Sequence, residues 1–78
     1  MTIYPNPTSG QLFVEMPDTY NTNGQLVLMD MFGRVQQNMD ASCTVCEMEV
    51  NALPNGVYFV VWKGENGEQS KARSFVKN

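Results

Sequence analysis

The sequence predicts an all-β fold, an immunoglobulin-like antiparallel β-sandwich of six to seven short strands. Short runs in which apolar and polar residues alternate recur along the chain, and turn residues close each run. These turn signals come roughly every 8–12 residues, a spacing typical of sandwiches and barrels. No stretch of about 11 residues has apolar positions at i, i+3, i+4 and i+7, so no amphipathic helix is expected.

The first half of the chain is expected to contain a short β-prone head and three strands. After the head, which includes Ile3 and Tyr4, apolar and polar residues alternate over residues 11–16. A turn at residues 21–24 contains an Asn-Gly pair and leads to a second alternating run at residues 25–30. Phe32-Gly33-Arg34 then turns the chain into a short strand at residues 35–38.

The second half is expected to begin with a loop over residues 39–45, where the sequence is polar and mixed. Residues 47–50 alternate again and predict a strand. Residues 57–62 are apolar throughout and rich in β-formers, which predicts a central strand with both faces covered. Glu65-Asn66-Gly67-Glu68 is a strong hairpin signal, and residues 70–76 form the predicted closing strand.

The segment Leu53-Pro54-Asn55-Gly56-Val57-Tyr58 predicts a turn that leads directly into the central strand. Pro54 presets φ for the first central turn position, and the Asn-Gly pair completes the turn. A tyrosine just past such a turn can fold its ring over the corner of a sandwich, with its hydroxyl bonded to an upstream backbone group. We therefore interpret Tyr58 as a structural tyrosine corner.

Composition excludes several function classes. The 78 residues suffice for one small domain, with 42% hydrophobic and 17% charged residues. The net charge of −3 and the five basic residues in total argue against a nucleic-acid binder, which needs a basic stripe. No transmembrane segment and no signal peptide are expected, because neither roughly 20 consecutive apolar residues nor a basic n-region followed by an apolar stretch occurs.

Cys43-Thr44-Val45-Cys46 is the only pair with a reactive pattern. A thioredoxin-type redox pair needs a helix N-terminus within a βαβ unit, and none is predicted here. A zinc site needs four ligands, which only carboxylates could complete in a chain without histidine. A local disulfide, which a turn permits and an extended strand does not, and two free thiols remain open as alternatives.

Catalysis is not expected. The chain has no histidine, the commonest general base, and no nucleophile-elbow, P-loop or dinucleotide-binding motif. Asp40, Glu47 and Glu49 are too few and too widely spaced for a calcium loop. We therefore expect no catalytic residue, no cofactor and no metal site. Four aromatic residues could instead form a sugar-stacking platform, although Trp62 shares strand parity with Tyr58 and is better explained as core: Tyr4, Tyr20, Phe32 and Trp62.

Four motifs occur in order along the chain. They are Tyr4-Pro5-Asn6-Pro7 with Gly10, Leu26 and Leu28 followed by Asp30-Met31-Phe32-Gly33-Arg34, then Leu53-Pro54-Asn55-Gly56-Val57-Tyr58, and finally Phe75-Val76-Lys77. In this order and spacing the chain resembles the type A C-terminal sorting domain of proteins exported by the type IX (Por) secretion system of Bacteroidota. One departure is Ser74, which stands where that family often has lysine.

The resemblance implies a non-catalytic secretion signal. It implies that residues 1–78 are a single sorting domain, detached from an unknown N-terminal passenger that it directs across the outer membrane. The implied partners are the type IX translocon and a sortase-like peptidase, which cleaves before Tyr4, so that the passenger passes through the periplasm to the cell surface or the exterior. The alternative hypothesis is a fibronectin-III-like adhesion or carbohydrate-binding module.

The C-terminal strand is the candidate recognition surface. Alternation places one set of residues on one side of this strand, and we expect that set to be exposed: Lys71, Arg73, Phe75 and Lys77. The smaller set, which includes Val76, would then be buried. As the last strand it could also be a sheet edge that pairs with a receptor strand. The alternative is that Phe75 belongs to the core and the strand faces the other way.

Overall fold

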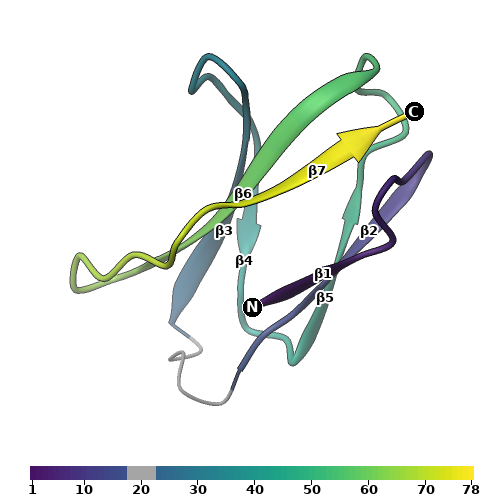
Figure 1. The fold of residues 1–78 in the computed structure, drawn as a ribbon. Coiled ribbons are helices and arrows are strands. Elements are labelled where there is room, and N and C mark those ends of the chain that lie inside the picture. Colours follow the sequence, from purple (N-terminus) through teal and green to yellow (C-terminus); the bar gives the residue numbers. More distant parts are fainter. Residues whose placement is uncertain (18–22) are drawn as a thin grey trace.

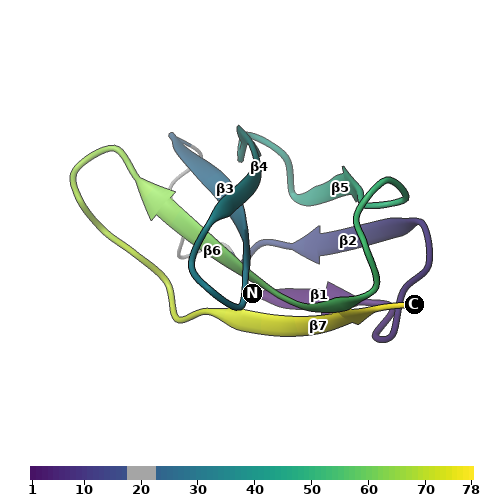
Figure 2. The same ribbon diagram turned by 90° about the horizontal axis from the view of Figure 1, so that it is seen from above.

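The computed structural model describes residues 1–17 and 23–78, and these form two packed antiparallel sheets (Figures 1 and 2). The first sheet has the order β1-β2-β5, with β1 (Thr2–Tyr4), β2 (Gln11–Glu15) and β5 (Val45–Glu49). The second has the order β4-β3-β6-β7, with β4 (Val35–Asp40), β3 (Gly24–Asp30), β6 (Gly56–Gly64) and β7 (Arg73–Lys77). The predicted all-β sandwich is confirmed.

The core lies between the two sheets and is built from the alternating positions of each strand. Leu12 and Val14 of β2 face Leu26 and Leu28 of β3, and all four side chains have no exposed surface. The remaining buried members come from the other strands and the segments that follow them: Ala41, Cys46, Met48, Val50, Tyr58, Val60, Trp62 and Phe75. Alternation therefore identified the inward face of the first strands correctly.

Strand β6 is the inner strand that the apolar run predicts. It lies between β3 and β7, and its adjacent residues Val60 and Val61, which point to opposite faces, are both buried. Val61 pairs with Val27 of β3, which is also buried although it belongs to the outer face of the sheet. Both faces of β6 are thus covered at its centre, as expected.

Several strand boundaries differ from the prediction. Strand β5 begins at Val45, inside the expected loop, and β6 runs on to Gly64. Strand β4 runs on to Asp40, within the expected loop, because its pairing with β3 continues through Met39 opposite Leu26. Strand β7 begins at Arg73 rather than Ser70. The Ser70 amide instead donates a hydrogen bond to the Trp62 carbonyl. The Ser70 hydroxyl oxygen accepts one from the Trp62 amide, and both bonds are 2.9 Å long. Part of the predicted turn at residues 21–24 lies outside the described residues.

Trp62 is packed into the core at the end of the sheet, with 3% of its surface exposed. Gly24 and Gly64 are paired across β3 and β6 beside it. A Cβ on Gly24 would lie 2.6 Å from Trp62 Nε1, and a Cβ on Gly64 would lie 2.7 Å from Trp62 Cη2. The two glycines therefore leave the room that the indole ring occupies. This confirms the core interpretation of Trp62 and removes it from any sugar-binding surface.

Candidate functional site: one end of the sandwich

The four sequence motifs meet at one end of the sandwich, which we call the motif end, except that Leu26 and Leu28 of the second motif lie in the core along β3. It holds the β1–β2, β3–β4 and β5–β6 connections together with the C-terminus, at the top of Figure 1. The sheet register brings Asp30, Tyr58 and Phe75 into one row across β3, β6 and β7. Next to that row, Lys77 is opposite Gly56 on one side and forms a bridge with Thr8 on the other.

The β5–β6 corner is closed by Tyr58. Its hydroxyl donates a hydrogen bond to the carbonyl oxygen of Pro54 at 2.6 Å, and its ring is buried. The ring stacks on Phe75, with 5.7 Å between centroids and 25° between planes. The predicted tyrosine corner is confirmed, and its role is to hold the turn of the Leu53–Tyr58 motif against the sheet.

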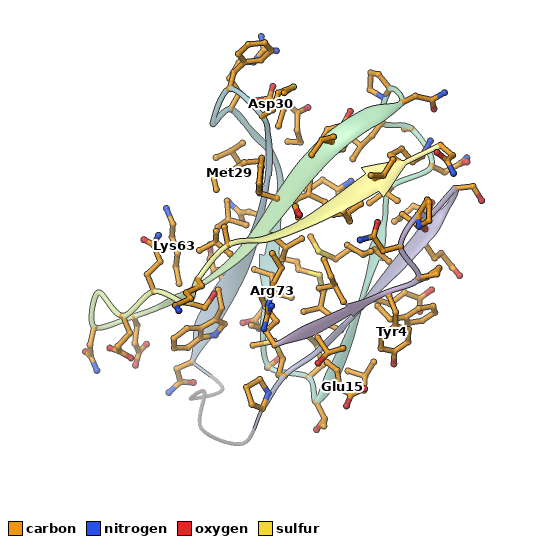
Figure 3. The ribbon with its side chains drawn as sticks, viewed as in Figure 1. Tyr4, Glu15, Met29, Asp30, Lys63 and Arg73 are labelled. Atoms are coloured by element: carbon orange, nitrogen blue, oxygen red, sulfur yellow. A yellow bond between two sulfur atoms is a disulfide. The ribbon has the colours of Figure 1, made fainter. Side chains whose placement is uncertain are left out.

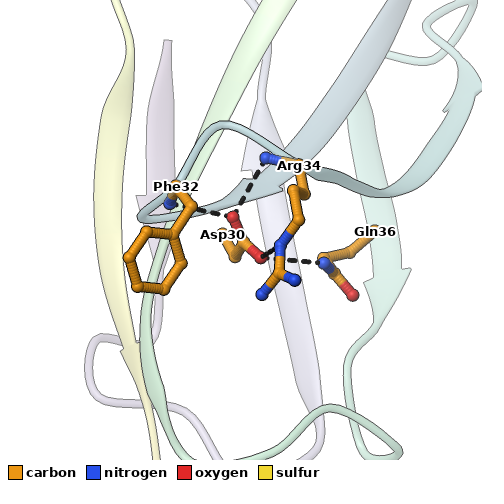
Figure 4. A network of polar contacts seen from close by, with 4 residues as sticks. All are labelled: Asp30, Phe32, Arg34 and Gln36. Atoms are coloured by element: carbon orange, nitrogen blue, oxygen red, sulfur yellow. Dashed lines mark hydrogen bonds and ion pairs between the residues drawn. The ribbon is translucent and has the colours of Figure 1, made fainter.

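The β3–β4 turn is organised by the carboxylate of Asp30 (Figure 4). One oxygen, Oδ1, accepts the backbone amides of Phe32 and Arg34 at 2.9 and 3.0 Å. The other, Oδ2, accepts Arg34 Nε at 2.7 Å and Gln36 Nε2 at 3.2 Å. Gly33 completes the turn with φ +81°, in the left-handed region that glycine adopts freely.

These contacts change the acidity of Asp30. Burial by itself raises the pKa of this carboxyl. Two other effects outweigh this burial and lower the pKa below the usual 3.8. They are the hydrogen bonds donated by Arg34, from its backbone and side chain, and by the Phe32 amide, and the positive charge of Arg34. Sequence reasoning placed Asp30 at the end of a strand and in the second motif, but it did not predict that its carboxylate organises the turn. The signal was present, because an aspartate two residues before a turn amide commonly binds that amide.

The head motif reaches the last strand of the chain. Tyr4 stacks on Phe13 of β2, with 5.7 Å between ring centroids. After Tyr4 the chain leaves the first sheet, and Asn6 Oδ1 accepts the backbone amide of Val76 at 2.9 Å. The amide of Thr8 donates to the Val76 carbonyl, and the amide of Asn78 donates to the Thr8 carbonyl, both at 2.9 Å. The two ends of the chain are therefore paired.

The structure corrects the predicted orientation of the C-terminal strand. Phe75 and Lys77 are 1% and 6% exposed, whereas Val76 is 39% exposed. The alternative, that Phe75 is a core residue, is the one confirmed, because it lies opposite the buried Tyr58 and packs on its ring. The expected stripe is reduced to Lys71 and Arg73, which are exposed. The edge of β7 is also not fully free, since residues 6–8 cover its C-terminal half.

Exposed apolar side chains gather at the motif end, which sequence reasoning did not predict. Phe32 is 78% exposed and Met31 64%, and the Arg34 guanidinium lies 5.4 Å from the centre of the Phe32 ring. An open groove of about 330 Å³ runs between the β3–β4 turn and the β5–β6 turn, and its lining includes Phe32, Arg34, Pro54 and Val57. Two of the motifs therefore form the walls of one surface groove.

The cysteine pair lies at the opposite end, with Cys43 in the β4–β5 connection and Cys46 in β5 itself. Cys43 and Cys46 form a disulfide with 5.3 Å between their Cα atoms, so of the alternatives left open the structure contains the local disulfide. Within residues 1–17 and 23–78, no group of three metal-ligating side chains comes together. Glu47 and Glu49 of β5 are exposed on the outer face of the first sheet. Tyr4 of β1 and Glu15 of β2 project from the same face (Figure 3).

No helix formed by the described residues is long and apolar enough to cross a membrane.

Comparison with known proteins gives one match. The family model of the secretion system C-terminal sorting domain matches residues 2–78. Searches of curated proteins and of solved structures found no match to the chain.

Proposed function

This chain belongs to the family of secretion system C-terminal sorting domains, and from that membership we propose how its surface serves export. As a member of this family the chain is a type IX secretion signal, non-catalytic, for proteins exported across the outer membrane to the cell surface or the exterior. Its function implies interaction with the secretion machinery. The observation that carries this conclusion is the match over residues 2–78.

The proposal adds the finer assignments. Residues 1–78 act as one sorting domain of type A behind an N-terminal passenger. The translocon and a sortase-like peptidase are its partners, and the peptidase cleaves before Tyr4. The passenger is then attached to the surface or released. The order of the four motifs supports this assignment, as does their convergence at one end of the fold.

We further propose that the machinery reads the motif end and the adjoining strand β7. The exposed candidates on β7 and just before it are Lys71, Arg73 and Val76. Phe75 and Lys77 contribute by fixing the strand, because both are buried. The other motif residues shape the turns at this end: Tyr4, Pro5, Asn6, Pro7, Gly33, Leu53, Gly56 and Tyr58. The adhesion-module alternative loses its main aromatic candidate, since Trp62 is buried.

A reporter fusion tests the function. A periplasmic reporter fused to the N-terminal end of residues 1–78 should reach the surface of a bacterium with a working type IX system, measured by protease accessibility on intact cells. The same fusion in a translocon-null strain is the control and should remain in the periplasm. Equal surface delivery in the two strains would overturn the proposal.

A further inference from the structure

The edge of β7 is occupied by the head of its own chain. We call residues 6–8 the head segment. It contributes two backbone hydrogen bonds, from the Thr8 amide to the Val76 carbonyl and from the Asn78 amide to the Thr8 carbonyl, both 2.9 Å long. A third bond of 2.9 Å runs from the Val76 amide to Asn6 Oδ1. The outward backbone groups of the last residues are therefore paired within the molecule.

This cover is short. Thr8 pairs with β7 through its main-chain amide and carbonyl. At Asn6 a side-chain oxygen, rather than the main chain, accepts the Val76 amide. A continuous strand in the same place, paired through its main chain at every second residue, could form a longer ladder with β7. The head segment thus forms fewer hydrogen bonds with the backbone of β7 than an ordinary strand would.

The geometry also defines the direction of a strand that could replace the head segment. The bridge between Thr8 and Lys77 is parallel, so the edge already accepts a segment that runs in the direction of β7. Val76 directs both its amide and its carbonyl to this edge. By strand alternation the backbone of Ser74 faces the same edge, beside an open hollow of about 260 Å³ lined by Met1–Ile3, Arg73 and Ser74.

Positive charge marks the beginning of this edge. Lys71 and Arg73 are exposed and form no ion pair with any residue in the described part of the chain. A strand parallel to β7 passes Arg73 with its first residues and reaches Lys77 with its last. Acidic side chains in its first half would therefore be attracted to this end of the edge.

We propose that the edge of β7 is a docking site for an extended strand of the secretion machinery, which displaces the head segment and pairs parallel to β7. The incoming strand carries acidic residues where it passes Arg73. This inference rests on the proposed function only in naming the secretion machinery as the source of the strand. The head segment then acts as a competitor for the same backbone groups.

A binding experiment on the purified chain tests the docking site. The probe is a synthetic six-residue peptide, Glu-Thr-Val-Thr-Val-Thr with blocked ends, and its control carries Lys in place of Glu. The Asn6→Leu variant removes the oxygen that accepts the Val76 amide, whereas Asn6→Asp keeps an acceptor and is the matched control. Because the head segment covers the edge in the free chain, Asn6→Leu should bind the acidic probe about tenfold more tightly than the wild type or Asn6→Asp.

Changes in the NMR chemical shifts of the backbone amides show where the probe binds. We expect the acidic probe to shift the amides of Ser74, Val76 and Asn78, and the lysine probe to bind more weakly. Protected amides at Leu28 and Val60 would verify that the variant is folded, and Asn6→Ala replaces it if it is not. Equal affinity for the three proteins, or shifts elsewhere on the molecule, would overturn the proposal.

The result is separable from the export function. The peptide titration needs no secretion system, and the reporter fusion needs no knowledge of the bound strand. Surface delivery by a chain whose β7 edge binds no probe would reject only the docking site. Probe binding by a chain that delivers no reporter would reject only the export function.

Discussion

At the scale of single residues, Tyr58 joins two of the sequence motifs through its hydroxyl and its ring. Its hydroxyl reaches back four residues to the Pro54 carbonyl, so the turn before β6 and the strand itself are held by one side chain. Its ring covers Phe75 of the terminal strand. The tyrosine therefore supports two of the four motifs at once, and its contribution is to stability.

Replacing Tyr58 with phenylalanine keeps the stacked ring and removes only the hydroxyl. Pro54 is exposed, so water can replace the lost donor, and we expect the free energy of unfolding to fall by about 1 kcal/mol. Urea denaturation measures the change. Tyr4→Phe is the matched control, because Tyr4 is 40% exposed and its hydroxyl has no hydrogen bond to the described residues. An unchanged unfolding midpoint for Tyr58→Phe would show that the hydroxyl is simply hydrated.

At the scale of elements, the β3–β4 turn shows how a charge can shape a loop. Two backbone amides and two side chains converge on the Asp30 carboxylate, which fixes the path from Met31 to Gln36. The turn in turn presents Phe32 to solvent and forms one wall of the motif-end groove. Ionised Asp30 is the form that accepts all these bonds.

The lowered pKa of Asp30 predicts how stability depends on pH. A carboxyl whose folded pKa lies below its unfolded value contributes stability above that value and loses it as pH falls through the folded pKa. Asp30→Asn should therefore reduce the free energy of unfolding most at neutral pH, and its difference from the wild type should shrink as pH falls below the usual 3.8. Chemical denaturation between pH 7 and about 2 measures this.

Glu47→Gln is the control for that series, because Glu47 is an exposed carboxylate on the outer face of β5. Its profile should follow the wild type. A constant difference between Asp30→Asn and the wild type at every pH would contradict the assigned role of the charge.

At the scale of the whole molecule, the motif end, which we propose as the recognition surface, lies opposite the disulfide. The motifs and the C-terminus occupy one end, and at the other end a disulfide joins Cys43 of the β4–β5 connection to Cys46 of β5. The exposed cations Lys71 and Arg73 precede or begin the strand that leads to the motif end. Truncating residues 74–78 is therefore not a clean test of recognition, since it removes Phe75 from the core.

A charge change at Lys71 and Arg73 tests recognition without touching the core. In the reporter fusion, the Lys71→Glu, Arg73→Glu double variant should fold normally and reduce surface delivery by about tenfold, because charge reversal slows encounter with a complementary partner. The matched variant with glutamine at both positions should have an intermediate effect. Circular dichroism verifies folding, and normal export of the folded double-glutamate variant would show that these charges are not recognised.

Features that depend on neighbours along the chain could be predicted before the fold was known. Alternation located the strands, Gly33 and Gly67 located turns that require positive φ, and the four-residue span from Pro54 to Tyr58 predicted the tyrosine corner. The four ordered motifs were sufficient to recognise the family. Each strand, turn and motif is a local signal, because its hydrogen bonds or side-chain spacing involve residues a few positions apart; the order of the motifs is read along the whole chain.

The orientation of β7 and the cover of its edge depend instead on contacts between residues far apart in the sequence. A period of two residues defines two faces but does not say which is buried, and here the Tyr58 ring opposite Phe75 makes that choice. The bond between Asn6 and Val76 joins residues 70 positions apart, so no local pattern could predict it. The choice between a disulfide and free thiols likewise depended on how close the loop brings the two Cα atoms, which spacing along the chain leaves open.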